Sequence, residues 1–152
     1  YVLIALGAEP HVEQNWALES GLYTLDGKHF GPALEAVDLP VSSLCEVYRP
    51  GTRVGTISPS MAETTGLPTD VALVVGGADH VLSAYAAGVD TAGDWLIKLG
   101  GAGDILTACA DPIVDARLYL DAHPRQGTWL PNGCMATSGS LIRWFQTLIG
   151  GT

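Results

Sequence analysis

Apolar residues recur at helical spacing near the C-terminal end of the sequence. Within "TSGSLIRWFQTLIGG" the apolar positions are Leu141, Ile142, Trp144, Phe145, Leu148 and Ile149. They fall at i, i+1, i+3, i+4, i+7 and i+8, which places them along one side of an α-helix. The segment therefore predicts an amphipathic helix that begins at a serine cap and ends at Gly150.

A second helix is predicted near the N-terminal end, in "VEQNWALESGLYTL". Trp16, Leu18 and Leu22 are the apolar residues expected on its buried side. Asp26 and Gly27 follow, and this pair is typical of a turn. Residues 28–50 predict a loop-rich connection.

The middle of the sequence predicts a strand, a tight turn and a helix. The run "VALVV", residues 71–75, is apolar without alternation, as expected of a strand buried on both faces in a parallel sheet. Gly76 and Gly77 predict the turn. Asp79 stands where an N-cap belongs, and the helix "HVLSAYAAG" ends at Gly88.

A strand and a short helix are also predicted just before this run. "TRVGTI" has the composition of a strand. Ser60 and Glu63 have the spacing of a capping box at the start of a helix. Gly66 and Pro68 would end that helix.

The last part of the chain predicts a glycine-tipped hairpin. Two strand-like runs, "WLIKL" and "DILTACA", are separated by Gly100, Gly101, Ala102 and Gly103. A further strand is expected around "TWLPNGCMA", after an irregular segment. The polar break "GVDTAGD" before the hairpin is the best candidate for a domain boundary or hinge. Strands alternating with helices indicate an α/β fold.

Composition and charge restrict the class of protein. The chain has 152 residues, of which 47% are hydrophobic and 15% charged, and its formal net charge is −9. This acidic balance argues against nucleic-acid binding, because such proteins gather lysine and arginine against phosphates. No apolar run approaches the length needed to cross a bilayer. A protein of the cytoplasm is expected, and the missing initiator methionine leads us to expect a piece of a longer chain.

Cysteine and histidine give no metal or disulfide pattern. Cys45, Cys109 and Cys134 are odd in number and lie far apart in the sequence. The histidines lack the spacing of zinc ligands. No bound metal site is expected in this chain.

The glycine-rich tip is a candidate anion site. Residues without bulky side chains expose backbone N–H groups, and such a concavity binds anionic oxygen. An ordinary tight hairpin is the alternative. The sequence does not match the Walker pattern, since no GK[ST] follows.

Asp79 is a candidate catalytic base. Its position at the carboxyl end of a strand is where ligands gather in open α/β sheets. A helix start also keeps a carboxylate ionised and able to accept a proton. The alternative is a plain N-cap, and the two roles are compatible. A Rossmann-like oxidoreductase is disfavoured, because "GGADHV" does not match GxGxxG.

The order of these features carries a family resemblance. The stretch "VALVVGGADHVLSAYAAGVDTAGDWLIKLGGAGDIL" resembles the FGGY family of carbohydrate kinases, and "GSLIRWF" is similar to the family's early second-domain helix. The resemblance implies a ribonuclease H-like (actin-like ATPase) fold. Residues 1–92 would end the sugar-binding domain, and residues 93–152 would begin the nucleotide-binding domain.

The resemblance also implies roles for particular residues. Asp79 matches the base that takes the proton from a sugar hydroxyl as its oxygen attacks the γ-phosphate of ATP. Gly77 and His80 stand at substrate-binding positions, although His80 has an equal alternative as an ordinary helix residue. Gly100, Gly101, Ala102 and Gly103 match the loop that cradles the nucleotide phosphates.

ATP, Mg²⁺ and a small sugar or polyol, such as a ketose, are the ligands that this resemblance implies. It gives no reason to expect nucleic acid or membrane as a partner. It allows a homodimer of the full-length enzyme.

Two departures from the family leave an alternative open. Gly101 and Ala102 replace the usual threonine and serine, so the loop offers only N–H donors. The family's DxGT-like phosphate loop and its adenosine-binding glycine motif are absent from this sequence. The fragment alone is therefore expected to be inactive. The alternative function is a catalytically inactive sugar-binding or regulatory module of the same fold.

Overall fold

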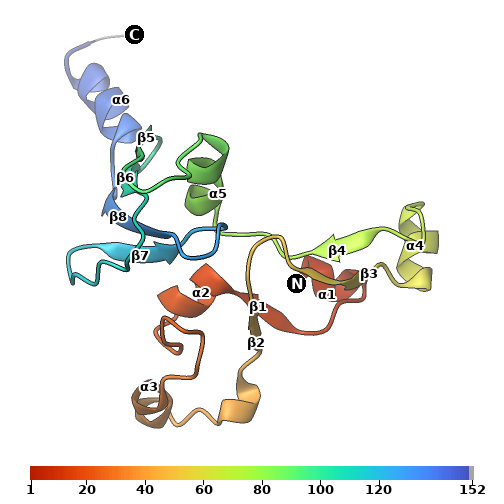
Figure 1. Ribbon diagram of the computed structural model, residues 1–152. Coiled ribbons are helices and arrows are strands. Elements are labelled where there is room, and N and C mark those ends of the chain that lie inside the picture. Colours follow the sequence, from red (N-terminus) through yellow and green to blue (C-terminus); the bar gives the residue numbers. More distant parts are fainter. Residues whose placement is uncertain (151–152) are drawn as a thin grey trace. The chain divides into compact units, whose positions relative to one another are not determined.

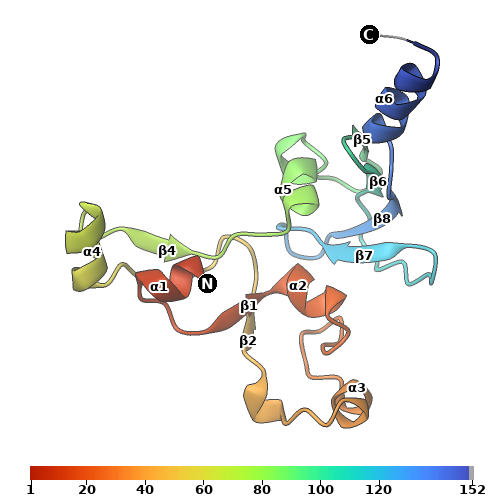
Figure 2. The ribbon, with the colours of Figure 1, turned by 180° about the vertical axis from the view of Figure 1, so that it is seen from behind.

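The computed structural model describes residues 1–150. The chain divides into two compact units, Tyr1–Ala78 and Asp79–Thr152, whose elements are labelled in Figure 1 and are seen from behind in Figure 2. The division falls after Ala78, and the family domain boundary expected between residues 92 and 93 stays a prediction. Over residues 1–150, none of the helices has the length and apolar character that crossing a membrane requires.

The first unit contains short helices and two separate pairs of strands. Its elements are α1 (Val2–Leu6), β1 (His11–Glu13), α2 (Gln14–Glu19), α3 (Gly31–Ala36), the 3-10 turn η1 (Val41–Ser43), β2 (Glu46–Tyr48), β3 (Arg53–Thr56), α4 (Pro59–Thr65) and β4 (Ala72–Val74). Strands β1 and β2 pair in parallel. Strands β3 and β4 pair antiparallel, with an irregular register between Arg53 and Gly55.

The "VALVV" strand is confirmed, but its predicted setting is wrong. Strand β4 pairs with the preceding strand, β3, in antiparallel direction. Leu73 is buried whereas Ala72 and Val74 are exposed, so β4 alternates instead of being covered on both faces. The predicted tight turn is also wrong, because residues 75–78 form no turn. Gly76 does not have a positive φ.

A small apolar core joins α1, β3, α4 and β4. Ala8, Ile57, Ala62 and Leu73 are its buried members. Gly7 ends α1 with a φ of 117°, a conformation that glycine adopts readily. A side chain at this position would also lie 3.0 Å from the Cβ of Ser58. Glycine therefore allows the end of α1 to approach the start of α4.

Two local predictions in this unit need correction. Helix α2 is shorter than expected and buries Asn15 and Ala17, while Trp16 is 61% exposed and Leu18 and Leu22 are half-buried. The cap of α4 is Ser58 instead of Ser60: its hydroxyl accepts the Met61 N–H at 3.3 Å, and Pro59 occupies the first helical turn. The predicted end of α4 at Gly66 is confirmed.

The second unit is built on a four-stranded antiparallel sheet. Its elements are α5 (Asp79–Ala86), β5 (Trp95–Leu99), β6 (Gly103–Thr107), β7 (Tyr119–Ala122), β8 (Trp129–Met135) and α6 (Gly139–Leu148). The strand order is β5-β6-β8-β7. The β5–β6 hairpin, the β8 strand and both helices confirm the sequence predictions. Strand β7, which pairs with β8, lies in the segment that was expected to be irregular.

The two faces of this sheet differ in cover. One face carries buried side chains: Asp104 and Leu106 on β6, Leu130 and Asn132 on β8, and Asp121 on β7. The other face carries exposed apolar side chains, namely Trp95, Ile97, Leu99, Ile105 and Met135. We call this second set the open apolar face.

Helix α5 is attached to the β7 end of the sheet through its side chains. Val81 and Ala84 of α5 are fully buried. The rings of Tyr85 and His123 meet edge to face, with 5.6 Å between their centroids. His123 also forms a hydrogen bond through Nε2 with the carbonyl oxygen of Val89 at 2.9 Å. These contacts fix the position of α5, and so of its first residue Asp79, relative to the sheet.

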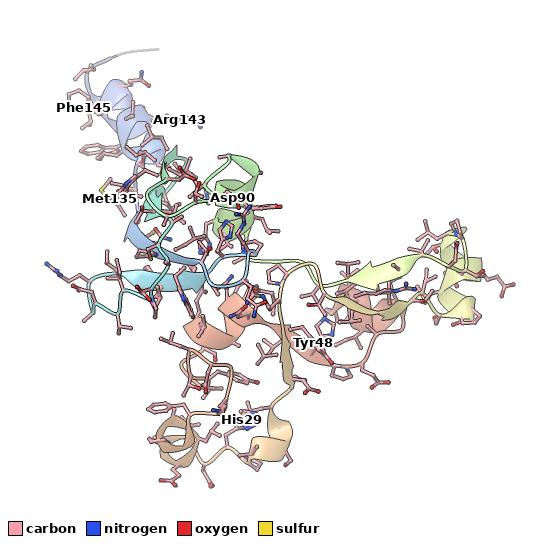
Figure 3. The ribbon with its side chains drawn as sticks, in the orientation of Figure 1. His29, Tyr48, Asp90, Met135, Arg143 and Phe145 are labelled. Atoms are coloured by element: carbon pink, nitrogen blue, oxygen red, sulfur yellow. The ribbon has the colours of Figure 1, made fainter. Side chains whose placement is uncertain are left out.

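Helix α6 confirms the amphipathic prediction, although its apolar side stays uncovered. None of its residues is buried within the described chain. Met135 on the sheet and Phe145 on α6 are both exposed, and Figure 3 shows their side chains directed away from the ribbon. Gly150 adopts a φ of 75° just after the helix.

Candidate functional site

Asp79 is the first residue of α5, one residue earlier than the predicted helix start. Its side chain is 93% exposed. The His80 backbone N–H and the His80 ring both interact with the carboxylate, and the positive charge of Lys98 acts on it as well. These groups hold the pKa of Asp79 below its ordinary value. The exposed carboxylate is therefore ionised at neutral pH and can accept a proton.

His80 and Gly77 flank Asp79 in the chain. His80 turns its ring inward, and its Nε2 lies 3.1 Å from Oδ2 of Asp121 on β7. Gly77 belongs to the first unit and lies in segment 75–78, which has no regular secondary structure. The structure thus brings Asp79 and His80 together on one helix end. The substrate-binding roles of Gly77 and His80 stay predictions.

The glycine-rich tip joins β5 to β6 as predicted. The Gly100 N–H donates to the Ala102 carbonyl at 2.9 Å within the tip. The N–H groups of Gly101 and Ala102 donate no hydrogen bond to any part of the chain that the structure describes. Two adjacent backbone donors are therefore available to an anionic ligand.

The start of α6 packs directly against this tip. Ser138 N–H donates to the Gly101 carbonyl, and Gly139 N–H donates to the Gly100 carbonyl, each at 2.8 Å. A Cβ at Gly139 would lie 2.6 Å from the Gly100 oxygen, and a Cβ at Gly103 would lie 2.9 Å from the Ser138 Cβ. Both positions leave no room for a side chain. The tip conformation thus depends on Ser138 and on Gly139 at the start of α6, two residues that no sequence pattern had linked to the tip.

Ser140 places a hydroxyl group beside the tip. Its Oγ lies 3.5 Å from the position that a Cβ of Gly101 would occupy. The tip itself has no side-chain hydroxyl group at Gly101 and Ala102, and the nearby Ser140 hydroxyl comes from the first turn of α6. The "SGS" before the apolar helix is the signal that could have pointed to this, because small polar residues mark helix starts.

Lys98 interacts electrostatically with an acid that follows the tip and with Asp79. It lies on β5 one residue before Leu99, where the strand ends. Its Nζ is 3.5 Å from Oδ2 of the buried Asp104, the first acid after the loop. Its charge also lowers the pKa of Asp79. An exposed carboxylate, a cation and a tip with two backbone N–H donors that face no acceptor within the described residues therefore belong to one compact unit.

The comparisons with known proteins agree on one class of enzyme. No family model matches the chain. A xylulose kinase of Staphylococcus epidermidis is 30% identical over 95 residues, covering 61% of this chain and 19% of the relative. The autoinducer-2 kinase of Escherichia coli is 28% identical over 147 residues, covering 93% of this chain and 27% of the relative.

Solved structures extend the match over nearly the whole chain. The xylulose kinase of Rhodospirillum rubrum is 40% identical with a TM-score of 0.86, covering 93% of this chain and 29% of that one. The glycerol kinase of Plasmodium falciparum, solved with ADP, has a TM-score of 0.75 at 9% identity and supports the fold alone. This chain thus spans less than a third of these proteins. The chain has the ribonuclease H-like, actin-like fold, and its sequence and structural neighbours indicate the FGGY family of carbohydrate kinases.

Proposed function

We propose that the protein containing this chain transfers the γ-phosphoryl group of ATP to a hydroxyl group of a small sugar or polyol. Asp79 acts as the general base, and the tip at Gly100–Gly103 holds the nucleotide phosphates. Ketoses are the first acceptors to test, because two of the matched relatives are named xylulose kinases. Gly77 and His80 are proposed to lie on the acceptor side.

One observation carries this proposal. The ionised carboxylate of Asp79 and the unpaired N–H groups of Gly101 and Ala102 lie in the same compact unit. Lys98 lies on the strand that leads into the tip, and its charge reaches Asp79. A base for a hydroxyl proton and donors for phosphate oxygens are the two parts that phosphoryl transfer needs.

The proposed step moves one proton and one phosphoryl group. The acceptor hydroxyl loses its proton to Asp79 while its oxygen forms a bond to the γ-phosphorus. The bond between that phosphorus and the bridging oxygen of ATP breaks, and ADP leaves. The backbone donors at the tip stabilise charge on the phosphate oxygens during this exchange. Mg²⁺ enters with ATP as the metal–nucleotide complex, and no residue of this segment is assigned to it.

The test is an exchange of Asp79 in the full-length protein. Asp79→Ala is expected to lower sugar-dependent ADP release by about 10²–10⁴-fold, the usual contribution of a general base, while ATP binding is kept. Asp70→Ala is the matched control, because Asp70 is an exposed acid of the first unit. Turnover of Asp79→Ala near the wild-type rate with the best acceptor would overturn the base assignment.

A second candidate function has one observation in its favour. Gly101 and Ala102 bring no hydroxyl group to the tip, which suits a module that binds sugar without transferring phosphate. In that case the wild-type protein would bind an acceptor sugar but release no ADP with any member of a ketose and polyol panel. The same assay therefore separates the two candidates.

A further inference from the structure

The ring of His80 lies between two carboxylates. Its Nε2 is 3.1 Å from Oδ2 of Asp121, and its Nδ1 is 3.4 Å from Oδ1 of Asp79. Ionised carboxylate oxygens only accept hydrogen bonds, so each ring nitrogen that faces one serves as a donor.

Asp121 is an unusual residue for the interior of a sheet. It is 1% exposed, and its Oδ1 has no hydrogen-bond partner within residues 1–150. Burial of a carboxylate with one unsatisfied oxygen costs free energy, and an apolar side chain would serve the packing better. Because Asp121 costs free energy of folding where it lies, it points to a role other than stability.

Attachment of α5 does not depend on Asp121 alone. Tyr85 of the same helix contacts the ring of His123, and Val81 and Ala84 are fully buried. What Asp121 adds is specific to His80, because its contact fixes one edge of the imidazole ring. The opposite edge of the ring then faces Asp79.

We propose that Asp121 is a positioning residue that acts through His80: it holds the imidazole by Nε2 so that Nδ1 orients the Asp79 carboxylate for proton abstraction. This inference rests on the proposed function. An imidazole has nitrogens on opposite sides of a rigid ring and can therefore join two carboxylates in line. A side-chain amide, with a single nitrogen, does not offer this geometry.

A double-mutant cycle in the full-length kinase tests the inference. Asp121→Asn keeps the shape of the side chain and removes its charge, and His80→Gln removes the ring. Each single change is expected to lower kcat about tenfold, a part of what a general base contributes, with the KM for ATP unchanged. If Asp121 acts through His80, adding Asp121→Asn to His80→Gln lowers kcat no further.

Tyr85→Leu is the matched control. It removes the ring contact between α5 and His123 and leaves the Asp121–His80–Asp79 series in place. It is expected to lower the melting temperature without a comparable loss of kcat. An equal loss of kcat in Tyr85→Leu would mean that Asp121 serves only to attach α5, and this would overturn the inference.

Two further outcomes would also overturn it. One is a loss of kcat on Asp121→Asn that is as large in the His80→Gln variant as in the wild-type protein. The other is wild-type kcat in His80→Gln, which decides the matter even if Asp121→Asn does not fold. The Asp79→Ala variant tests the proposed function separately. If its turnover is near normal, Asp79 is not the base and the proposed function fails, whatever the role of Asp121.

Discussion

The groups around Asp79 keep its carboxyl group in the ionised form. A largely exposed carboxylate would ordinarily titrate near pH 4. Here the backbone N–H and ring of His80 donate to it, and Lys98 adds a positive charge. All three act in the same direction, because each favours the ionised form and lowers the pKa. Asp79 is thus kept ready to accept a proton.

On the proposed function, this environment predicts the pH dependence of phosphoryl transfer. A base must be ionised to work, and the lowered pKa of Asp79 keeps it ionised until the pH falls below the ordinary range for aspartate. The acid limb assigned to Asp79 is therefore expected below about pH 4. Lys98→Met removes a favourable charge, so the pKa of Asp79 should rise and that limb should move to higher pH. Carbon-13 NMR titration of the Asp79 carboxyl measures this directly.

Arg117→Met supplies the matched control for this titration. Arg117 carries the same charge but pairs with Asp115 at 2.7 Å, on an exposed part of the second unit. Its loss should leave the titration of Asp79 unchanged. A downward shift or no shift in Lys98→Met would contradict the assigned electrostatic effect.

Single residues also show where sequence patterns stop being informative. Asp79 and the glycines of the tip are candidates from the sequence because their residue types carry chemistry in themselves, and their roles stay predictions. Asp121 was missed because a charged residue indicates an exposed position unless its partner is known, and His80 is 41 residues away in the sequence. Trp16 was expected to be buried, and it is exposed because α2 ends after fewer than two turns and buries Asn15 and Ala17 instead.

Among the elements, the β5–β6 hairpin and α6 act as one assembly. The Gly101 and Gly100 carbonyl groups of the tip accept hydrogen bonds from the N–H groups of Ser138, the residue before α6, and Gly139, its first residue. The N–H groups of Gly101 and Ala102 stay available. The helix therefore holds the tip by its acceptors while leaving its donors for a ligand.

This assembly predicts the effect of a methyl group at position 139. Gly139→Ala would place a carbon atom 2.6 Å from the Gly100 oxygen, so the tip must shift. The KM for ATP is expected to rise about tenfold, since displacements near 1 Å in a site have effects of that order or larger. Alanine favours helix over glycine, so α6 itself is not weakened. On the proposed function, steady-state kinetics of the full-length protein measures the change.

Gly133→Ala is the matched control in the same sheet. The nearest atom to its new methyl group would be a Leu118 carbon at 3.8 Å, an ordinary contact. Its KM for ATP should stay at the wild-type value. If Gly139→Ala also kept that value, the tip would not depend on α6 in the way described.

Elements with strong local patterns were predicted from the sequence, and their partners were not. Periodicity identified α6, and glycine between two apolar runs identified the β5–β6 hairpin. Strand β7 was missed because buried Asp121 interrupts the apolar alternation of "LYLDA". The antiparallel pairing of β4 was missed because an apolar run does not specify the direction of its neighbour.

At the scale of the whole molecule, the second unit carries much uncovered apolar surface. The open apolar face holds Trp95, Ile97, Leu99, Ile105 and Met135, and α6 exposes its entire apolar side. Strand β5, which contributes three of the five, lies at an edge of the sheet. Exposed apolar surface on an edge strand favours association.

The 152-residue chain expressed by itself is therefore expected to self-associate. Sedimentation velocity at rising protein concentration should show species larger than a monomer, and a dye that binds apolar surface should increase its fluorescence. Ile97→Lys, within the open apolar face, should reduce both effects. Val114→Lys is the control, because Val114 is equally apolar and exposed but lies outside that face. Equal effects of the two changes would rule out this face as the site of association.

The use of main-chain donors at the tip has an evolutionary consequence. A point mutation to any residue except proline exchanges a side chain and keeps the N–H groups of Gly101 and Ala102. On the proposed function, most mutations at the tip therefore leave the donors for the nucleotide phosphates in place. The acceptor side depends instead on side chains such as His80, which mutation can exchange. A lineage built on this design can change which sugar it modifies while keeping the same phosphoryl donor.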